Sequence, residues 1–304
     1  MPSVNGTFTP QTVNFAGALQ SLLYEGLYQT GLQPASLYEA QLANRIGTPP
    51  ADWISVCGAA PVLTTGGVTN ASSFTTGSLS PGEIVTLFGS GMGPTSIVTA
   101  TINALGLVDT TLAGTRVLFD GIPAPIVYTR ADTVSAVVPY ATADKSSTMV
   151  QIEYQGQVSP AAPFPIASTT PGIFELGASH WVLNQDGTIN SPANPAATGS
   201  VVVFYATGGG QTNPAGVDGS LAAVPLPSPV GRVSATIGGA NATILYAGAA
   251  PGFVAGLLQI NVRVPAGVPS PAALLLNHRR SIQPIGMRSR HKMKTWRSNL
   301  PPLM

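Results

Sequence analysis

Ser90 comes nearest to a catalytic pattern, because it lies between two glycines in Gly89-Ser90-Gly91. A nucleophilic serine needs a base within reach, and a nucleophile elbow needs a glycine two residues before the serine. That earlier position is Phe88, and a second copy of the same text has Thr207 in place of the serine. The pattern therefore indicates a glycine-rich strand corner with positive φ, and we assign no catalytic residue.

Residues that could bind a metal are few and poorly spaced. None of the three histidines has a second ligand at the spacing that zinc sites use: His180, His278 and His291. Asn184, Asp186 and Asn190 partly match a calcium loop, but the acidic residue that should close the loop is missing. Asp186-Gly187 between two apolar runs is more typical of a hairpin turn. We predict no metal site.

No motif for a cofactor is present either. Gly89–Gly93 has the wrong spacing for a dinucleotide fingerprint, and the sequence has no Walker lysine. The carboxylates are scattered without an evident pair for acid–base catalysis. We therefore expect no cofactor and no enzymatic activity, and the sequence names no ligand-binding residue.

Charge is distributed unevenly along the chain. Residues 1–278 contain all 12 acidic side chains and six of the 13 basic ones, whereas residues 279–304 contain seven basic side chains and no acidic one. This basic tail, with Trp296 in it, could contact nucleic acid or an anionic surface. It lacks any periodicity and the rest of the chain is acidic, so we predict no specific nucleic-acid partner.

The composition indicates many short strands joined by tight turns. The chain has 304 residues, of which 44% are hydrophobic and 8% charged, with 34 Gly and 28 Pro. This length allows two domains, each with its own core. Cys57 is the only cysteine, so an intrachain disulfide is excluded. No apolar run is long enough to span a membrane, and no signal peptide is recognisable in the first 25 residues.

A segment of sequence that occurs twice predicts the strands. Val233–Ile237 and Leu258–Pro265 alternate apolar and polar residues, as half-buried strands do, and Gly238-Gly239 supplies a hairpin turn. A similar text lies about 118 residues earlier, from Thr115 to Pro139, and Gly199–Tyr205 repeats Gly82–Phe88. An insertion at 247–257 distinguishes the second copy and is predicted to be a surface loop.

The two ends of the chain differ from the repeated part. Apolar spacing predicts two short helices within residues 1–60, and residues 58–67 are interpreted as a linker. The text after Leu276 departs from the first copy, so we expect residues 279–304 to be disordered or aberrant, as a shifted reading frame would produce. The second unit would then lack its closing strand and expose an unpaired edge.

These motifs resemble two related families. Pro81–Gly93, Val117–Gly121 and Val137–Pro139 are similar to the immunoglobulin-like IPT/TIG domain. Residues 66–278 resemble more closely the Solibacter uncharacterised C-terminal domain, and the motifs of that likeness are Val68–Phe74, Pro171–Phe174, Leu183–Pro195 and Leu245–Gly252. The resemblance implies an accessory module at the end of an exported bacterial protein, located extracellularly or at the cell surface.

We therefore expect an all-β fold of two tandem Ig-like β-sandwiches, at 68–167 and 171–278, preceded by a short helical segment. The expected function is a non-enzymatic structural or adhesion-type module whose partner is a surface polysaccharide or a protein. One alternative is a carbohydrate-binding domain in which Trp181, Tyr205 or Tyr246 stacks on sugars, although their strand contexts suggest that these rings are buried. The other is a hydrolase with an unrecognised site, which turnover abolished by Ser90→Ala would support. Loops at 183–195 and 247–257 are the candidate binding surfaces.

Overall fold

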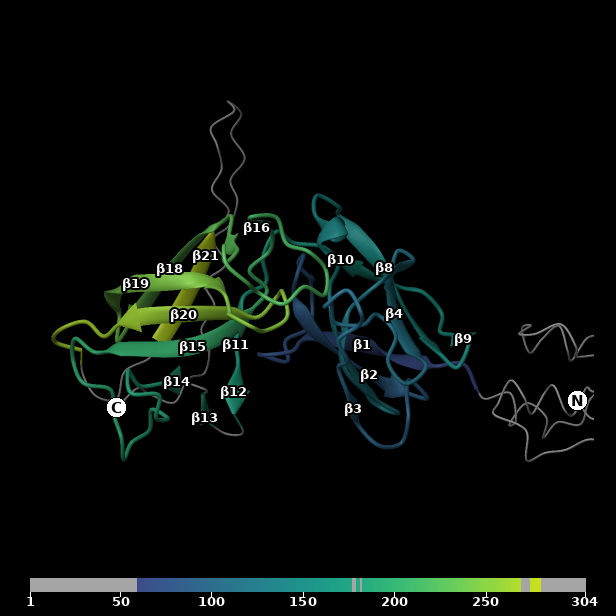
Figure 1. The fold of residues 1–304 in the computed structure, drawn as a ribbon, viewed down its shortest axis with the longest axis horizontal. Coiled ribbons are helices and arrows are strands. Elements are labelled where there is room, and N and C mark those ends of the chain that lie inside the picture. The colour runs from purple at the N-terminus through teal and green to yellow at the C-terminus, as the bar shows by residue number, and fades with distance from the viewer. Residues whose placement is uncertain (1–58, 177–178, 181, 269–273, 280–304) are drawn as a thin grey trace, which may run out of the picture.

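The computed structural model describes residues 59–176, 179–180, 182–268 and 274–279 (Figure 1). Within these ranges the chain is almost entirely β, with antiparallel sheets and no α-helix. A single 3-10 turn, Tyr140–Thr142, occurs in the same ranges. No helix of the described part is long and apolar enough to cross a membrane. The predicted all-β class is confirmed in this part of the chain.

The N-terminal half of the described chain, up to residue 167, contains two sheets. One sheet has the order β1-β2-β7-β6-β3, and the other has the order β10-β8-β4-β5 with β9 added beside β8. The strands are β1 Val62–Asn70, β2 Ile84–Ser90, β3 Val98–Thr99, β4 Thr115–Phe119, β5 Ile122–Pro123, β6 Ile126–Arg130, β7 Thr133–Val137, β8 Ser147–Tyr154, β9 Gln157–Val158 and β10 Ala162–Pro165.

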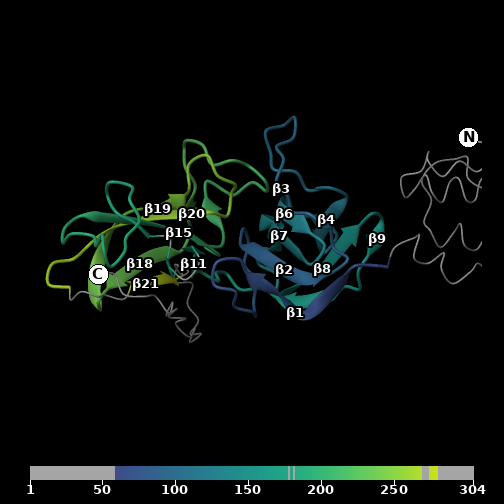
Figure 2. The ribbon, with the colours of Figure 1, turned by 90° about the horizontal axis from the view of Figure 1, so that it is seen from below.

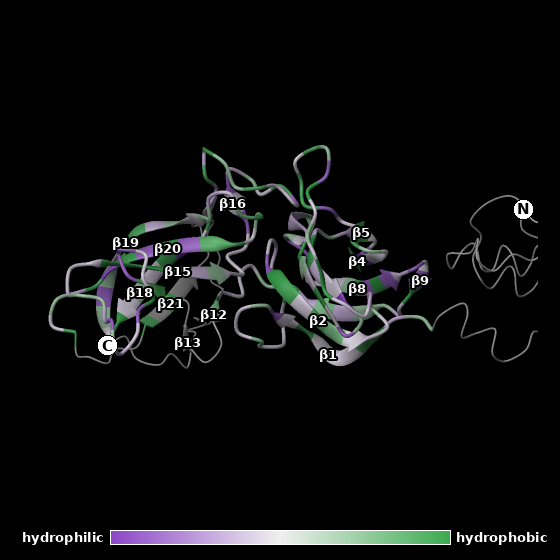
Figure 3. Ribbon diagram, turned by 60° about the horizontal axis from the view of Figure 1, so that its bottom comes forward, coloured by the Kyte–Doolittle hydropathy of each residue, from purple (hydrophilic) through white to green (hydrophobic). Residues whose placement is uncertain are grey.

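Both sheets contribute to one hydrophobic core. Leu87 and Val134 come from the first sheet, Phe119 and Ile152 come from the second, and all four side chains are fully buried. The alternation of these strands places one row of side chains inward, which is the arrangement of a β-sandwich. Figure 3 shows hydrophobic and hydrophilic segments alternating along strands of the two halves.

The C-terminal half, from residue 171, is built around a larger sheet with the order β11-β15-β20-β19-β18-β21, to which β14 adds beside β15. Its core includes Phe204, Ile237, Ile260 and Leu274. The strands are β11 Gly172–Ile173, β12 Glu175–Leu176, β13 Ser179–His180, β14 Val182–Leu183, β15 Val201–Thr207, β16 Thr212–Asn213, β17 Ser228–Pro229, β18 Arg232–Ile237, β19 Ala240–Ala249, β20 Leu258–Arg263 and β21 Leu274–Arg279.

The pairing of strands is duplicated together with the sequence. In the N-terminal half β7 lies between β2 and β6, and β4 pairs with both β5 and β8. In the C-terminal half β20 lies between β15 and β19, and β18 pairs with both β19 and β21. A register shift falls between Ile126 and Tyr128 in one half and between Ile244 and Tyr246 in the other. The repeated text therefore extends to the position of a β-bulge.

Several of the two-residue hairpin turns have glycine as their second residue, where φ is positive. Ile237 pairs with Ala240 across Gly238 and Gly239, both of which have positive φ. A two-residue turn with both φ values positive matches the twist of the flanking strands. Asp120-Gly121 and Gln155-Gly156 have the same signs of φ. The predicted turn at Gly238-Gly239 is confirmed.

The interpretation of residues 58–67 as a linker is wrong for its described residues from Val62 onward, because β1 begins there and pairs with β2. The register of this pair shifts between Leu63 and Val68, and Gly66 in that gap has a φ of 68°. A Cβ on Gly67 would lie 2.6 Å from the carbonyl oxygen of Phe88. The Gly-Gly step is thus an irregularity within a strand, where close approach of two backbones requires glycine.

Two predictions about the ends of the chain lie mainly outside the described residues. The two short helices were expected within residues 1–60, of which only the last two are described, and the basic tail is described only at Arg279. The strand that ends there, β21, continues past Leu276 through His278 and pairs with β18 along its whole length. The expected break in strand structure after Leu276 is therefore wrong as far as Arg279.

Candidate functional site

The two halves of the chain meet where the first residues of β2 reach the last residues of β15 (Figures 1 and 2). These two strands hold equivalent positions in the repeated text. The contact also includes the connector at 167–171, the loop at 250–257 and the 3-10 turn at Tyr140. We call this contact region the junction, and it contains the most deeply buried charged group that the structure describes.

Glu83 lies at the centre of the junction and is 1% exposed. Asn70 Nδ2 donates to Glu83 Oε1 at 2.8 Å, and the Ser80 backbone N–H donates to Oε2 at 2.7 Å. The Thr170 hydroxyl lies 2.5 Å from Oε2 and 2.7 Å from the Ser80 hydroxyl. Asn70 Nδ2 also donates to the Thr170 carbonyl at 2.9 Å. Side chains from β1, the turn before β2 and the connector therefore converge on one carboxyl group.

Burial is the main influence on the charge of Glu83. Removal from water raises the pKa of Glu83 from 4.5 to about 7, although the hydrogen bonds from Thr170, Ser80 and Asn70 oppose this effect. No base of the described residues forms an ion pair with Glu83. A buried carboxylate without a counter-charge is costly. This group therefore changes its protonation state near neutral pH.

Thr207, the last residue of β15, joins β15 directly to the start of β2. Its hydroxyl accepts a hydrogen bond from the Ile84 backbone N–H at 2.8 Å and donates to the Gly256 carbonyl at 2.9 Å. The Thr207 side chain is fully buried. Sequence comparison of the two copies had aligned this residue with Ser90, which is exposed at the end of β2. The two equivalent positions thus differ in role: Thr207 holds the junction, and Ser90 faces solvent.

Two glycines allow the backbones to approach closely at the junction. A Cβ on Gly208 would lie 2.1 Å from the Thr170 carbonyl oxygen, and the Thr170 N–H donates to the Gly208 carbonyl at 2.9 Å. A Cβ on Gly256 would lie 2.3 Å from the Gly82 carbonyl oxygen. The prediction that 247–257 forms a surface loop is therefore only partly correct. Residues 247–249 belong to β19, whereas Ala250 and Ala255 are buried beside the junction.

Tyr140 forms a further contact between the halves, beside the one in which the Val108 N–H donates to the Gly219 carbonyl at 2.8 Å. Its backbone N–H donates to Asp218 Oδ1 at 2.8 Å, and its carbonyl accepts from Gln211 Nε2 at 3.1 Å. The ring lies so close to Gly82 and Gly216 that a Cβ on either glycine would overlap it. Burial, with a smaller effect from Asp218, raises the pKa of the Tyr140 hydroxyl to about 12. Tyr140 is therefore uncharged at any physiological pH.

A small cavity of about 170 Å³ lies beside Tyr140. Its walls are mainly apolar side chains and glycine backbone from the C-terminal half, including Leu221, Ala255 and Leu258. No charged side chain lines it. A cavity of this size and composition would fit only a small apolar group.

The residues considered for metal binding are engaged in local hydrogen bonds. Asn190 Nδ2 donates to Asn184 Oδ1 at 2.8 Å, and the Thr188 N–H donates to Asp186 Oδ1 at 3.0 Å. The hydrogen bonds from Thr188 lower the pKa of Asp186. Within the described ranges no group of three or more His, Cys, Asp or Glu side chains could hold a metal ion. The side chains of all three histidines lie outside the described residues.

The candidate sugar-binding rings lie in different surroundings from those expected. Trp181 is outside the described residues. Tyr205 is half-buried on the face of β15 opposite the fully buried Phe204, and Tyr246 is half-buried on β19. The ring centroid of Tyr205 lies 6.3 Å from that of Phe253, with an interplanar angle of 54°. The expectation that these two tyrosines lie in the core is therefore wrong, but the described pair of rings is tilted rather than coplanar.

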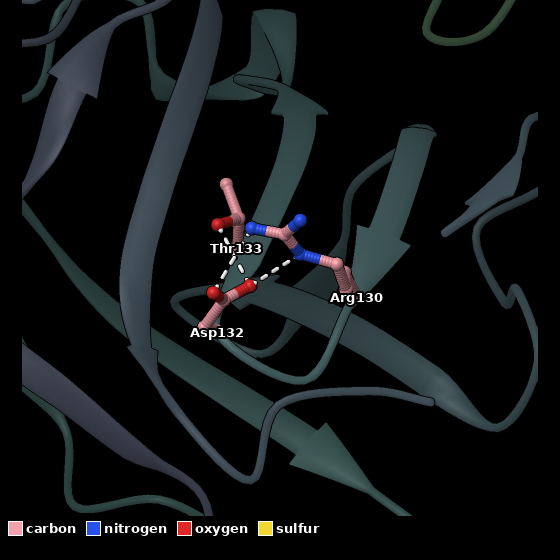
Figure 4. A network of polar contacts seen from close by, with 3 residues as sticks. All are labelled: Arg130, Asp132 and Thr133. Carbon is pink, nitrogen blue, oxygen red and sulfur yellow. Dashed lines mark hydrogen bonds and ion pairs between the residues drawn. The ribbon is translucent and has the colours of Figure 1, made fainter. Parts of the chain in front are cut away.

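Charged side chains at the surface form local pairs. At the turn between β6 and β7, Arg130 Nε donates to Asp132 Oδ1 at 2.6 Å and the Thr133 hydroxyl donates to the same oxygen at 3.1 Å (Figure 4). The hydrogen bond from Arg130 lowers the pKa of Asp132. Such exposed pairs contribute little to stability. We interpret this group as a support for the turn and not as a reactive site.

Sequence reasoning did not single out Glu83, Thr170 or Thr207 as residues of a site. One signal was present: the position equivalent to Glu83 in the second copy is Ser200, so an acidic residue precedes an apolar strand in one copy only. The sequence could not show that the end of β15 meets the start of β2 next to this residue. A search of protein-family models finds no match to the chain, and a search of curated proteins finds no similar sequence.

Proposed function

We propose that the protein is a rigid structural module in which two β-halves are held at a fixed orientation by the junction. The observation that supports this proposal most directly is the buried set of hydrogen bonds that joins Glu83 and Ile84 of the N-terminal half to Thr170 and Thr207. Buried polar groups favour one arrangement only when each finds its partner. A flexible linker between independent domains would not require such a set.

A wider role follows from the resemblance of residues 66–278 to the Solibacter C-terminal domain and to IPT/TIG domains. We infer that each half is an Ig-like β-sandwich and that the pair serves as a non-enzymatic, adhesion-type accessory module of an exported bacterial protein at the cell surface. The duplicated pairing of β2, β7 and β6 with that of β15, β20 and β19 supports the inference. Its partner would be a surface polysaccharide or a protein.

The rigid-module proposal predicts one narrow distance between the halves. Spin labels would be placed on cysteines introduced at Met149 of β8 and Ile189, which are 40% and 48% exposed, in a Cys57→Ser background. Double electron–electron resonance at pH 5.5 should then give a single narrow distance distribution for the full chain. Thr207→Val should broaden it, whereas the matched variant Thr207→Ser should not. A broad distribution in the unaltered junction would overturn the proposal.

A second candidate function is carbohydrate binding through the outer face of β15. The contact between Tyr205 and the 51%-exposed Phe253 favours it, because aromatic side chains at a surface can pack against the apolar faces of sugars. A glycan array with the full chain should then show binding that Phe253→Ala weakens at least about tenfold, the loss expected when a contact of about 1.4 kcal/mol is removed. Exposed Ile189 supplies a control, because Ile189→Ala should leave binding unchanged. Absence of binding to any glycan would exclude this candidate.

A further inference from the structure

We propose that Glu83 is a protonation-dependent latch: its neutral carboxyl group holds the two β-halves together, and its ionisation loosens the junction. The inference deepens the proposed rigid-module function and depends on it for its biological meaning. It rests on the position of one carboxyl group among uncharged partners at the contact between two halves of the chain.

The hydrogen-bond partners of Glu83 come from three segments of the chain, and none of them carries a charge. Asn70 belongs to β1, Ser80 to the turn before β2, and Thr170 to the connector. The titratable groups at the same junction are Tyr140, whose ring lies against Gly82, and Asp218, which accepts from the Tyr140 backbone N–H. Neither is a cation, so nothing among these groups compensates a negative charge on Glu83.

The same heavy atoms accommodate both protonation states. In the neutral state Glu83 Oε2–H donates to the Thr170 hydroxyl, which in turn donates to the Ser80 hydroxyl 2.7 Å away. In the ionised state the Thr170 hydroxyl turns its proton toward Oε2. The bonds from Asn70 Nδ2 and the Ser80 N–H are kept in both states. The states therefore differ mainly in whether a charge is buried without a counter-ion.

This burial couples protonation to the stability of the junction. The pKa of Glu83 is about 7 in the folded chain, against its ordinary value of 4.5. The folded chain therefore holds this proton roughly 300-fold more tightly than the unfolded chain. Because the folded-state pKa is raised, the stabilisation is fully present below pH 4.5 and is lost as the pH rises through about 7.

The same reasoning applies to opening of the junction without global unfolding. Once the halves separate, Glu83 is hydrated and its pKa returns toward its ordinary value. The fraction of molecules with an open junction should then rise with pH over the same interval. Thr170 N–H and Ile84 N–H report this opening, because both donate across the junction, to the Gly208 carbonyl and the Thr207 hydroxyl.

The test compares three forms of the full chain: the unaltered protein, Glu83→Gln and Glu153→Gln. Glu153 is a matched control, since it lies in the same half and pairs with Arg116 near the surface. Urea unfolding and amide hydrogen exchange at Ile84 and Thr170 would be measured from pH 4.5 to 8.5. For the unaltered protein and Glu153→Gln we expect the unfolding constant to rise about 150-fold across this interval, as proton linkage requires for a pKa raised from 4.5 to about 7. Glu83→Gln should remove most of this rise, and the remainder belongs to Asp218, whose pKa burial also raises.

At acidic pH, where Glu83 is neutral, Glu83→Gln is expected to be less stable than the unaltered protein, because its amide N–H would oppose either the Ser80 N–H or Asn70 Nδ2. If this variant fails to fold, the ¹³C resonance of the Glu83 carboxyl group in the unaltered protein still decides the matter. A midpoint near 7 supports the latch, and one near 4.5 overturns it. The latch alone would be refuted if the label distance stays narrow at every pH and neither the unfolding constant nor the exchange rates follow the ionisation of Glu83. A broad distance at every pH would refute the rigid module.

Discussion

At the scale of single residues, Thr207 shows how one hydroxyl group can join two halves of a chain. It satisfies the Ile84 N–H on one side and the Gly256 carbonyl on the other, in fully buried surroundings. A buried donor that loses its acceptor pays the cost of its removal from water. The stability of the junction should therefore depend on this oxygen more than on the volume of the side chain.

Thr207→Val tests this dependence, because it keeps the shape of the side chain and removes the oxygen. We expect it to lower the free energy of unfolding by about 1–3 kcal/mol, the usual cost of an unsatisfied buried polar group. Thr207→Ser keeps the oxygen and should cost at most about 1 kcal/mol for the lost methyl group. Urea unfolding at one pH measures both. Equal losses in the two variants would contradict the role assigned to the hydroxyl.

Gly208 and Gly252 are a matched pair for testing whether close approach of two backbones requires glycine. Their φ values are 77° and 78°, but a Cβ on Gly208 would meet the Thr170 carbonyl oxygen and one on Gly252 would meet nothing within 4 Å. Gly252→Ala should therefore cost only about 1 kcal/mol, for the left-handed backbone. Gly208→Ala should cost several times as much, because the connector must move. Thermal unfolding of the two variants measures the difference, and equal costs would contradict it.

At the scale of elements, period-two alternation and turn chemistry predicted much of the fold. The strands around Val233–Ile237 and Leu258–Pro265 and the turn at Gly238-Gly239 follow from local rules. β1 was missed because Thr64-Thr65-Gly66-Gly67 has the composition of a linker. Its strand structure depends on pairing with β2, which is not a local property.

Two valines of β1 test whether this stretch is part of the sheet. Val68 is fully buried in the core, whereas Val62 is 55% exposed at the other end of the strand. Val68→Ala should lower the free energy of unfolding by roughly 2 kcal/mol, for two buried methyl groups and the cavity that they leave. Val62→Ala should change it by less than about 0.5 kcal/mol, as at most surface sites. A neutral Val68→Ala in urea unfolding would contradict the placement of this end of β1 in the core.

At the scale of the whole molecule, the relation between the halves could not be predicted from the sequence. The repeat indicated two equivalent units, and the duplicated pairing of strands agrees with that repeat. The junction, however, uses residues that differ between the copies: Glu83 is equivalent to Ser200 in the repeat, and Thr207 is equivalent to Ser90. Contacts between copies depend on such differences. A search for residues shared by the copies therefore passes over them.

The candidate chemical residues of the sequence lie in separate places in the described part of the chain. Ser90 lies at the exposed end of β2, whereas Asn184 and Asp186 belong to a hydrogen-bonded turn of the other half. The position equivalent to Ser90 became part of a contact between the halves. We infer that specialisation of the two copies served their mutual packing.

Calorimetric unfolding of the full chain at pH 5.5, where Glu83 is neutral, would show whether the junction makes the two halves unfold as one body. We predict a single transition whose calorimetric and van't Hoff enthalpies agree, as they do for a cooperative unit. Gly208→Ala should split it into two transitions, and Gly252→Ala should not. Two separate transitions in the unaltered protein would contradict the account.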